Sequence, residues 1–279
     1  MDLLDARDKL AAFANRLGGK GSESEEYYRN CVVSFNDVPN MHSIQASFKK
    51  LRAFLVDFTR KGQKSFYSVL GESGWMRSLN KLLGLTLKMV EALQRGRSVF
   101  VHCSDGWDRT SQVCALAQML LDPYYRTLDG FLLLVEKEFS QAGHLFARRN
   151  RIFSPSKSEQ SPIFLQFLDA VQNIVTQFPN CFEFGAHLLR DLGLVSYFGV
   201  FSNFIANNQR EREQMRLDKY ALHSFDFFNA KRRLYMNPGY CRDLPLGRLR
   251  IKEVNLRFWK EFFFMYFEQS QHDFEIPKI

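Results

Sequence analysis

The feature that most constrains this chain is a short polar loop between an apolar run and an amphipathic segment. The apolar run, residues 98–102, is SVFVH, and the loop, residues 103–110, is CSDGWDRT. Apolar side chains then recur at helical spacing from Val113 to Leu121, until Asp122 and Pro123 stop the pattern. This order predicts a buried strand, a tight loop and a helix, which is a unit of an α/β fold.

A loop that runs directly into a helix N-terminus is a natural phosphate site. Its backbone N–H groups point into one concavity, with the positive end of the helix dipole behind them. Such a nest also stabilises a cysteine thiolate, here that of Cys103. Gly106 permits the tight backbone path. Arg109 offers a planar fork that can hold two phosphoryl oxygens. Of the five cysteines, Cys103 alone has arginine six positions later.

This pattern predicts a cysteine-dependent phosphatase in which Cys103 attacks phosphorus and water then hydrolyses the thiophosphate. A neutral Asp108 would suit a general acid, with Asp105 available for proton transfer or for a substrate hydroxyl. The other expected loop functions are substrate contacts from Ser104, Asp105, Gly106 and Trp107, orientation of the loop by His102, and a hydrogen bond from Thr110 to the Cys103 sulfur. The alternative is a buried structural cysteine beside a surface arginine.

Charge and cysteine content narrow the function class. The net charge of +8 and the pI near 9.2 suit an anionic partner, although ordinary surface lysines and arginines produce the same excess. No nucleic-acid-binding motif and no metal-ligand spacing occurs, so nucleic acid, a metal and a cofactor are not expected. The five cysteines are scattered and odd in number, which predicts a protein of the reducing cytoplasm. The sequence shows no secretory signal and no long apolar stretch, which predicts a soluble protein.

The remaining pattern predicts mostly helices. The end of a strand is expected near residues 3–7 and another strand over 31–38. Helices are expected over 40–58, 75–94, 128–139, 161–177 and 184–192. Residues 154–161 are predicted to be a solvated loop, and the charge run 207–219 an exposed helix end or linker. The aromatic C-terminal third is expected to pack in the core.

The string CSDGWDRT resembles the active-site loop of the myotubularin-related lipid phosphatases. LLDAR, VPNMHSIQASFKKL, LDPYYRTLDGF, SPIFLQFLDAV and QFPNCFEF also resemble family segments, from about residue 3 to about residue 265. The resemblance implies an α/β fold of the protein-tyrosine-phosphatase-like type, with a central sheet flanked by helices and a helix-rich C-terminal part. It also implies that residues 1–279 form a single, N-terminally truncated phosphatase domain, without a PH-GRAM domain or coiled coil.

The same resemblance implies a function and a set of contacts. The expected substrates are phosphatidylinositol 3-phosphate and, second to it, phosphatidylinositol 3,5-bisphosphate in an acidic, for example endosomal, membrane. It implies Cys103 as nucleophile, Arg109 as phosphate ligand and Asp108 as general acid, with Arg149 and Asn40 at the headgroup. Leu145 stands where members usually carry Lys or Arg towards the 5-phosphate, which predicts preference for the monophosphate. Association with other family members is also expected.

Two other functions stay open. A catalytically silent adaptor of the same fold is one, but silent relatives usually lack the cysteine or the arginine, and both Cys103 and Arg109 are present. A phosphotyrosine phosphatase is the other, and the two loop aspartates, Asp105 and Asp108, disfavour it.

Overall fold

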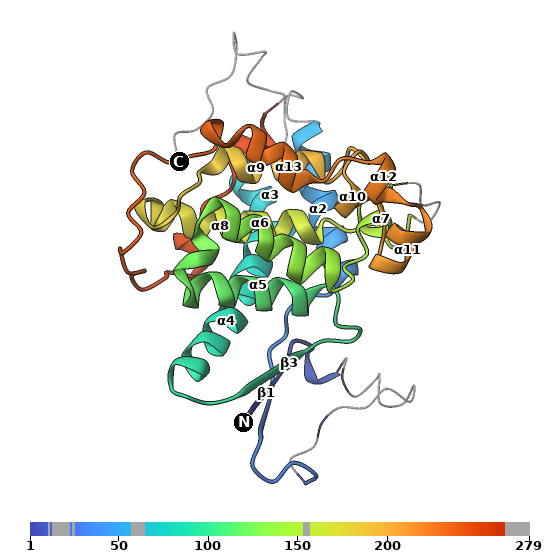
Figure 1. The fold of residues 1–279 in the computed structure, drawn as a ribbon. Helices are drawn as coiled ribbons and strands as arrows, with labels where there is room; N and C mark the ends of the chain where they lie inside the picture. Colours follow the sequence, from blue (N-terminus) through green and yellow to red (C-terminus); the bar gives the residue numbers. More distant parts are fainter. Residues whose placement is uncertain (11, 13–22, 24–25, 57–64, 153–156, 266–279) are drawn as a thin grey trace.

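The fold is built on a small parallel sheet beneath a large group of helices (Figure 1). The computed structural model describes residues 1–10, 12, 23, 26–56, 65–152 and 157–265 of the 279-residue chain. Strand β1 (Asp2–Asp5) lies between β2 (Val32–Phe35) and β3 (Val99–His102) and is parallel to both. Leu4 is in register with Ser34 on one side and Val101 on the other. The α/β prediction and the strand prediction near residue 3 are therefore confirmed.

The prediction of a buried strand before the loop is wrong in part. Within the described residues β3 pairs only with β1, so it forms one edge of the sheet. Its residues are half-buried or exposed, and Phe100 keeps 50% of its surface accessible. The apolar run SVFVH marked the strand correctly, because β-branched and aromatic residues favour extended backbone. It could not show how many strands lie beside it.

Helices make up most of the rest. The α-helices are α2 (Met41–Val56), α3 (Phe66–Ser73), α4 (Trp75–Gln94), α5 (Arg109–Leu121), α6 (Leu128–Val135), α7 (Phe146–Arg149), α8 (Ile163–Gln177), α9 (Ala186–Val195), α10 (Ser202–Ile205), α11 (Gln209–Gln214), α12 (Leu217–Tyr220), α13 (Ser224–Ala230) and α14 (Lys260–Phe263). Four 3₁₀ turns are η1 (Pro123–Arg126), η3 (Pro179–Cys181), η4 (Arg232–Leu234) and η5 (Glu253–Asn255), and η2 (Glu136–Gln141) is a π-helix.

The predicted helices are confirmed to within a few residues, with one change of type. The helix expected over 128–139 is α6, which continues as the π-helix η2. Residues 57–58 of another predicted helix, and 154–156 of the predicted loop, lie outside the described residues. Helix α4 matches its predicted bounds because Leu79, Leu82 and Leu83 form a buried stripe at helical spacing.

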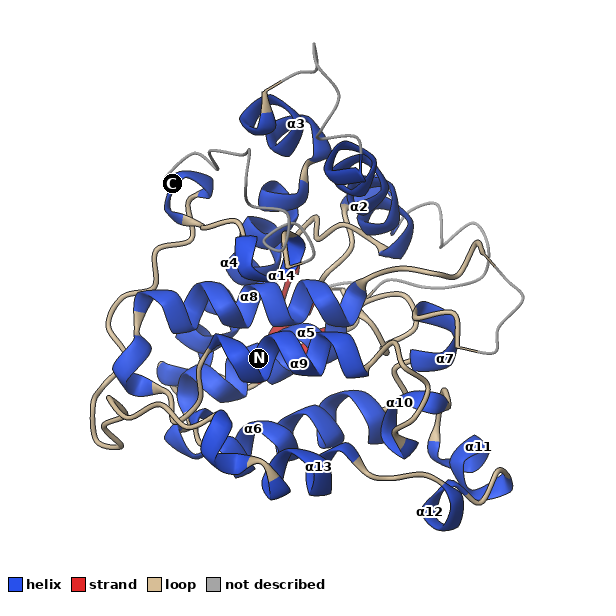
Figure 2. Ribbon diagram, turned by 90° about the horizontal axis from the view of Figure 1, so that it is seen from above, coloured by secondary structure: helices blue, strands red, loops and turns tan. Residues whose placement is uncertain are grey.

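The main core is one aromatic-rich cluster between these helices. Helices α8 and α9 lie side by side near its centre (Figure 2), and α8 is buried on almost every side. The Phe139 ring packs edge-on against Phe164 and at a tilt against Phe167, both of α8, with ring centroids 5.2 and 4.7 Å apart. Phe258 and Trp259 are also buried, so the core prediction for the C-terminal aromatics is confirmed where the structure describes them.

The charge run 207–219 is only partly a solvated segment. It folds into α11 and α12, and Arg212 is buried, with Nη2 donating to the Ser140 carbonyl at 2.6 Å. Here the aliphatic stem of arginine and its bond to a carbonyl make burial possible, a pairing that composition does not reveal. None of the described helices combines the length and the apolar character needed to cross a bilayer.

Candidate active site

The loop of residues 103–108 joins the end of β3 to the start of α5 and turns back on itself at Gly106. Gly106 has a φ of 88°, a conformation that glycine adopts without the strain other residues would pay. Its backbone N–H donates to the Cys103 sulfur at 3.3 Å. The sulfur thus faces a backbone donor near the N-terminus of a 13-residue helix, where a thiolate is stabilised.

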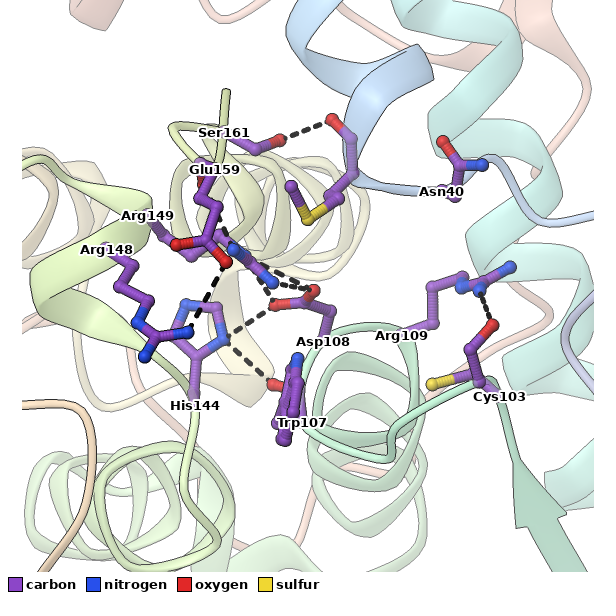
Figure 3. A network of polar contacts seen from close by, with 12 residues as sticks. Asn40, Cys103, Trp107, Asp108, Arg109, His144, Arg148, Arg149, Glu159 and Ser161 are labelled. Atoms are coloured by element: carbon purple, nitrogen blue, oxygen red, sulfur yellow. Dashed lines mark hydrogen bonds and ion pairs between the residues drawn. The ribbon is translucent and has the colours of Figure 1, made fainter. Parts of the chain in front are cut away.

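Arg109, the first residue of α5, is fixed on the same side of the loop. Its Nη2 donates to the Ser104 hydroxyl at 3.3 Å, and its Nη1 donates to the Val38 carbonyl at 3.1 Å. No carboxylate forms an ion pair with it among the described residues. Figure 3 shows Cys103 and Arg109 together, with the Asp108 side chain turned to the other side. The guanidinium charge therefore stays available to an anion held by the loop.

Asp108 belongs to a buried ion-pair network rather than to a neutral acid. Its carboxylate accepts from Arg149 Nη2 at 2.8 Å and from Arg149 Nε at 3.1 Å, and it lies 3.2 Å from His144 Nδ1 (Figure 3). Burial alone would raise the pKa of Asp108, but the hydrogen bonds and charges of His144 and Arg149 outweigh it and lower the pKa to about 2. The prediction of a neutral Asp108 is wrong for the free protein.

The side chains of this loop line a cavity of about 600 Å³. Its lining includes the predicted residues Asn40, Cys103, Ser104, Asp105, Trp107, Asp108, Arg109 and Arg149. Asn40 also caps α2, because its Oδ1 accepts from the backbone N–H groups of His42 and Ser43 at 3.0 Å. The structure thus brings residues from three distant segments to one concave site, and the helix entry at Asn40 forms one wall.

The two supporting residues behave differently from each other. His102 lies behind the loop as predicted, with Nδ1 3.1 Å from the Cys103 carbonyl oxygen and Nε2 2.9 Å from Glu23. The predicted bond from Thr110 to the Cys103 sulfur is wrong, since the buried Thr110 hydroxyl has no partner among the described residues. Thr110 lies in the first turn of α5, and the contact to sulfur comes from the Gly106 N–H instead.

Leu145 does not occupy the place expected of it. It is buried, with 8% of its surface accessible, and it does not line the cavity. The cavity lining therefore does not support the prediction that position 145 faces a 5-phosphate, which stays a prediction. Leu145 instead precedes α7, and its carbonyl accepts from the Arg149 N–H at 2.8 Å.

Two site residues were missed by sequence reasoning. Arg7 lines the cavity and is held by Asp5, with Nη2 2.7 Å from Oδ2 and Nε 3.0 Å from both oxygens. His144, which has no exposed surface, bridges Asp108 and the Trp107 carbonyl through Nδ1. The closeness of Asp5 and Arg7 at a strand end was the available signal for the first. His144 had no comparable signal, because its partners lie 36 and 37 residues away in sequence.

A metal does not fit this site. Asp5, Glu23 and His102 bring their ligand atoms within 4.8 Å of one another. Both oxygens of Asp5, however, accept from the Arg7 guanidinium, whose charge would repel a cation at that point. The cluster instead holds the strand ends beneath the loop.

Comparison with known proteins gives a consistent picture. Residues 1–213 match the model of the myotubularin-like phosphatase domain. Over 278 residues the chain is 38% identical to the phosphatidylinositol-3,5-bisphosphate 3-phosphatase MTMR6 of Mus musculus, covering 98% of this chain and 44% of that protein. Two relatives of Homo sapiens carry the same enzyme name, phosphatidylinositol-3,5-bisphosphate 3-phosphatase. The chain is 37% identical over 262 residues to one of them, MTMR8, and 44% identical over 220 residues to the other, MTMR4. These alignments cover 93% and 78% of this chain and 37% and 18% of those proteins. The chain thus spans less than half the length of these relatives.

Proposed function

The chain belongs to the myotubularin-like phosphatase family, and from this premise we propose that it is a phosphoinositide 3-phosphatase. The observation that carries the proposal is the placement of Cys103 and Arg109 on one side of a loop that closes onto α5, with a donor N–H at the sulfur. Among the described residues no carboxylate pairs with Arg109, and a catalytically silent adaptor does not need an unpaired arginine beside a cysteine. The three relatives named above are all phosphoinositide phosphatases by name, which favours a lipid over a phosphotyrosine substrate.

The proposed reaction has two steps. Cys103 Sγ attacks the 3-phosphorus, so that an S–P bond forms as the bond from phosphorus to the inositol oxygen breaks. Arg109 and the loop N–H groups hold the phosphoryl oxygens, whose charge grows in the transition state. Water then attacks the thiophosphate, and inorganic phosphate leaves as the thiolate returns.

The departing inositol oxygen needs a proton, and Asp108 is the proposed source. In the free protein Asp108 is ionised by its contact with Arg149 and His144. A phosphate dianion in the cavity is a like charge, and a like charge raises the proton affinity of a neighbouring carboxylate. Binding of substrate would thus prepare the acid. Asp105, at the exposed part of the cavity lining, is the alternative donor.

The proposed substrates are phosphatidylinositol 3-phosphate and its 3,5-bisphosphate. Besides Arg109, the cavity is lined by two buried arginines, Arg7 and Arg149, each fixed by one aspartate.

The proposed fold is that of the cysteine-dependent phosphatases. The main hydrophobic core is one cluster whose members range from Leu4 to Phe264, which supports a single domain. The substrate class supports action at membranes that carry these lipids, endosomal membranes among them.

The decisive experiment is phosphate release from a panel of soluble short-chain phosphoinositides and a phosphotyrosine peptide. The wild-type chain should release phosphate from the 3-phosphorylated lipids, and Cys103→Ser should release none at a measurable rate, because a hydroxyl is a far poorer nucleophile at neutral pH. Substrate binding to Cys103→Ser should persist, since the anion nest is intact. Turnover above about a tenth of the wild-type rate in this variant would contradict the covalent mechanism.

A further inference from the structure

A second cavity, of about 300 Å³, lies beside the candidate active site. Arg149 lines both cavities, so the two are separated at that point by one side chain. Phe48, Leu165 and Phe262 give the second cavity an apolar lining from α2, α8 and α14. The amphiphilic character of this lining differs from that of the catalytic cavity, to which four aspartates contribute.

The charge at the second cavity is of one sign. Lys49 and Arg52 line it from α2, on the same helix face as Gln45 and Phe48. Both cations are exposed, and neither forms an ion pair with a described residue. None of the residues lining this cavity is acidic. Two solvated cations thus lie over an apolar lining, and no acidic side chain in the described part of the chain pairs with them.

The loop of residues 197–200 is largely apolar and begins at the second cavity. Tyr197 lines the second cavity, and the next residues lead away from it through Gly199, whose φ is 64°. Phe198 is 61% exposed and Val200 is 49% exposed. Large apolar side chains that lie exposed close together are typical of an interaction site. The Asn150 side chain donates to the Ser196 carbonyl at 2.8 Å and so connects this loop to α7, which carries Arg149.

We infer that this face, formed by Lys49, Arg52 and the loop 197–200, docks on the surface of an anionic phospholipid bilayer. The aromatic and aliphatic tips of Phe198 and Val200 enter the interface, while Lys49 and Arg52 meet the lipid phosphates. Cations with no acidic partner among the described residues lie beside exposed apolar tips, and a bilayer offers lipid phosphates to the cations and acyl chains to the tips. A protein partner would need an acidic patch and an apolar pocket side by side. The inference rests on the proposed function, since a membrane-borne substrate must reach the cavity that shares Arg149.

The test is sedimentation of the full chain with vesicles that contain no phosphoinositide, so that turnover plays no part. The vesicles are phosphatidylcholine alone or phosphatidylcholine with phosphatidylserine. Wild type should bind the phosphatidylserine vesicles and lose binding as salt rises. Phe198→Ser should weaken binding about tenfold, and the double variant Lys49→Glu with Arg52→Glu should weaken it at least as much and remove the dependence on phosphatidylserine.

Matched controls come from exposed residues elsewhere. Arg95→Glu changes a 74% exposed arginine at the end of α4, and Tyr124→Ser removes a 47% exposed aromatic ring in η1, which follows the C-terminal end of α5. These controls should bind like wild type, with circular dichroism confirming that all variants are folded. Absence of wild-type binding, wild-type affinity in both test variants, or equal losses in the controls would each overturn the inference, whether or not the chain proves to be a phosphatase.

Discussion

Arg149 and Asp108 form a two-pronged ion pair inside the site, with Arg149 Nη2 2.8 Å from Asp108 Oδ2 and Nε 3.1 Å from Oδ1. The pair joins two elements 41 residues apart, the loop before α5 and the helix α7. Both side chains are buried, and a buried pair of this kind keeps its geometry because breaking it leaves an uncompensated charge. It fixes an arginine at the cavity and holds Asp108 ionised in the free protein.

Arg109→Lys should reduce kcat/KM by roughly ten- to a hundredfold, because an ammonium cannot reproduce two parallel charge-assisted hydrogen bonds. The lysine would also lose the two contacts that now fix Arg109, to the Val38 carbonyl and the Ser104 hydroxyl. Steady-state kinetics on a short-chain 3-phosphoinositide measures the effect. A loss of less than about threefold, in a variant as stable as wild type, would show that Arg109 is not the phosphate clamp.

Asp108→Asn should slow hydrolysis of a 3-phosphoinositide much more than hydrolysis of an activated aryl phosphate. A general acid matters most when the leaving oxygen is most basic, and an aryl oxide leaves without help. The measurement is kcat for both substrates in wild type and variant. Because the variant also breaks the ion pair with Arg149, the aryl phosphate serves as the internal control for damage to the site. Equal losses on the two substrates would assign the proton to another group, with Asp105→Asn the next variant to measure.

The sequence predicted this site where the signal is local. Periodic leucines gave α4 its bounds, and the order of apolar run, loop and amphipathic segment gave the placement of Cys103, Gly106 and Arg109. It failed where the outcome depends on distant packing. The ionised state of Asp108 is set by Arg149 of α7 and by His144 of the segment before it, both more than 30 residues away in sequence. The edge position of β3 and the burial of Leu145 likewise follow from tertiary neighbours, which no local pattern reports.

Asp108 should also make the fold sensitive to acid. Its pKa is lowered from 3.8 to about 2, so the folded state binds its proton less readily than the unfolded state does. The stabilisation is present above about pH 4 and is lost as pH falls towards 2, in total about 2 kcal/mol. The free energy of unfolding, measured by urea denaturation, should therefore differ less between wild type and Asp108→Asn at pH 3 than at pH 6. A difference that stays constant with pH would mean that Asp108 gains nothing from ionisation in the folded state.

Leu145→Lys should destabilise the protein rather than change its substrate preference. Leu145 is buried and lies outside the cavity lining, so a lysine there must either bury an unpaired charge or push its ammonium out through packed side chains. Large losses of stability arise from unpaired charges buried in this way, and we expect about 3 kcal/mol or more. Leu145→Met is the matched control, since it keeps the volume and adds no charge, and it should cost less than about 1.5 kcal/mol. Urea denaturation gives both values, and specificity constants for the 3-phosphate and 3,5-bisphosphate lipids give the preference. If Leu145→Lys were as stable as Leu145→Met and favoured the bisphosphate, the side chain at position 145 would have to reach the headgroup, contrary to its place in this structure.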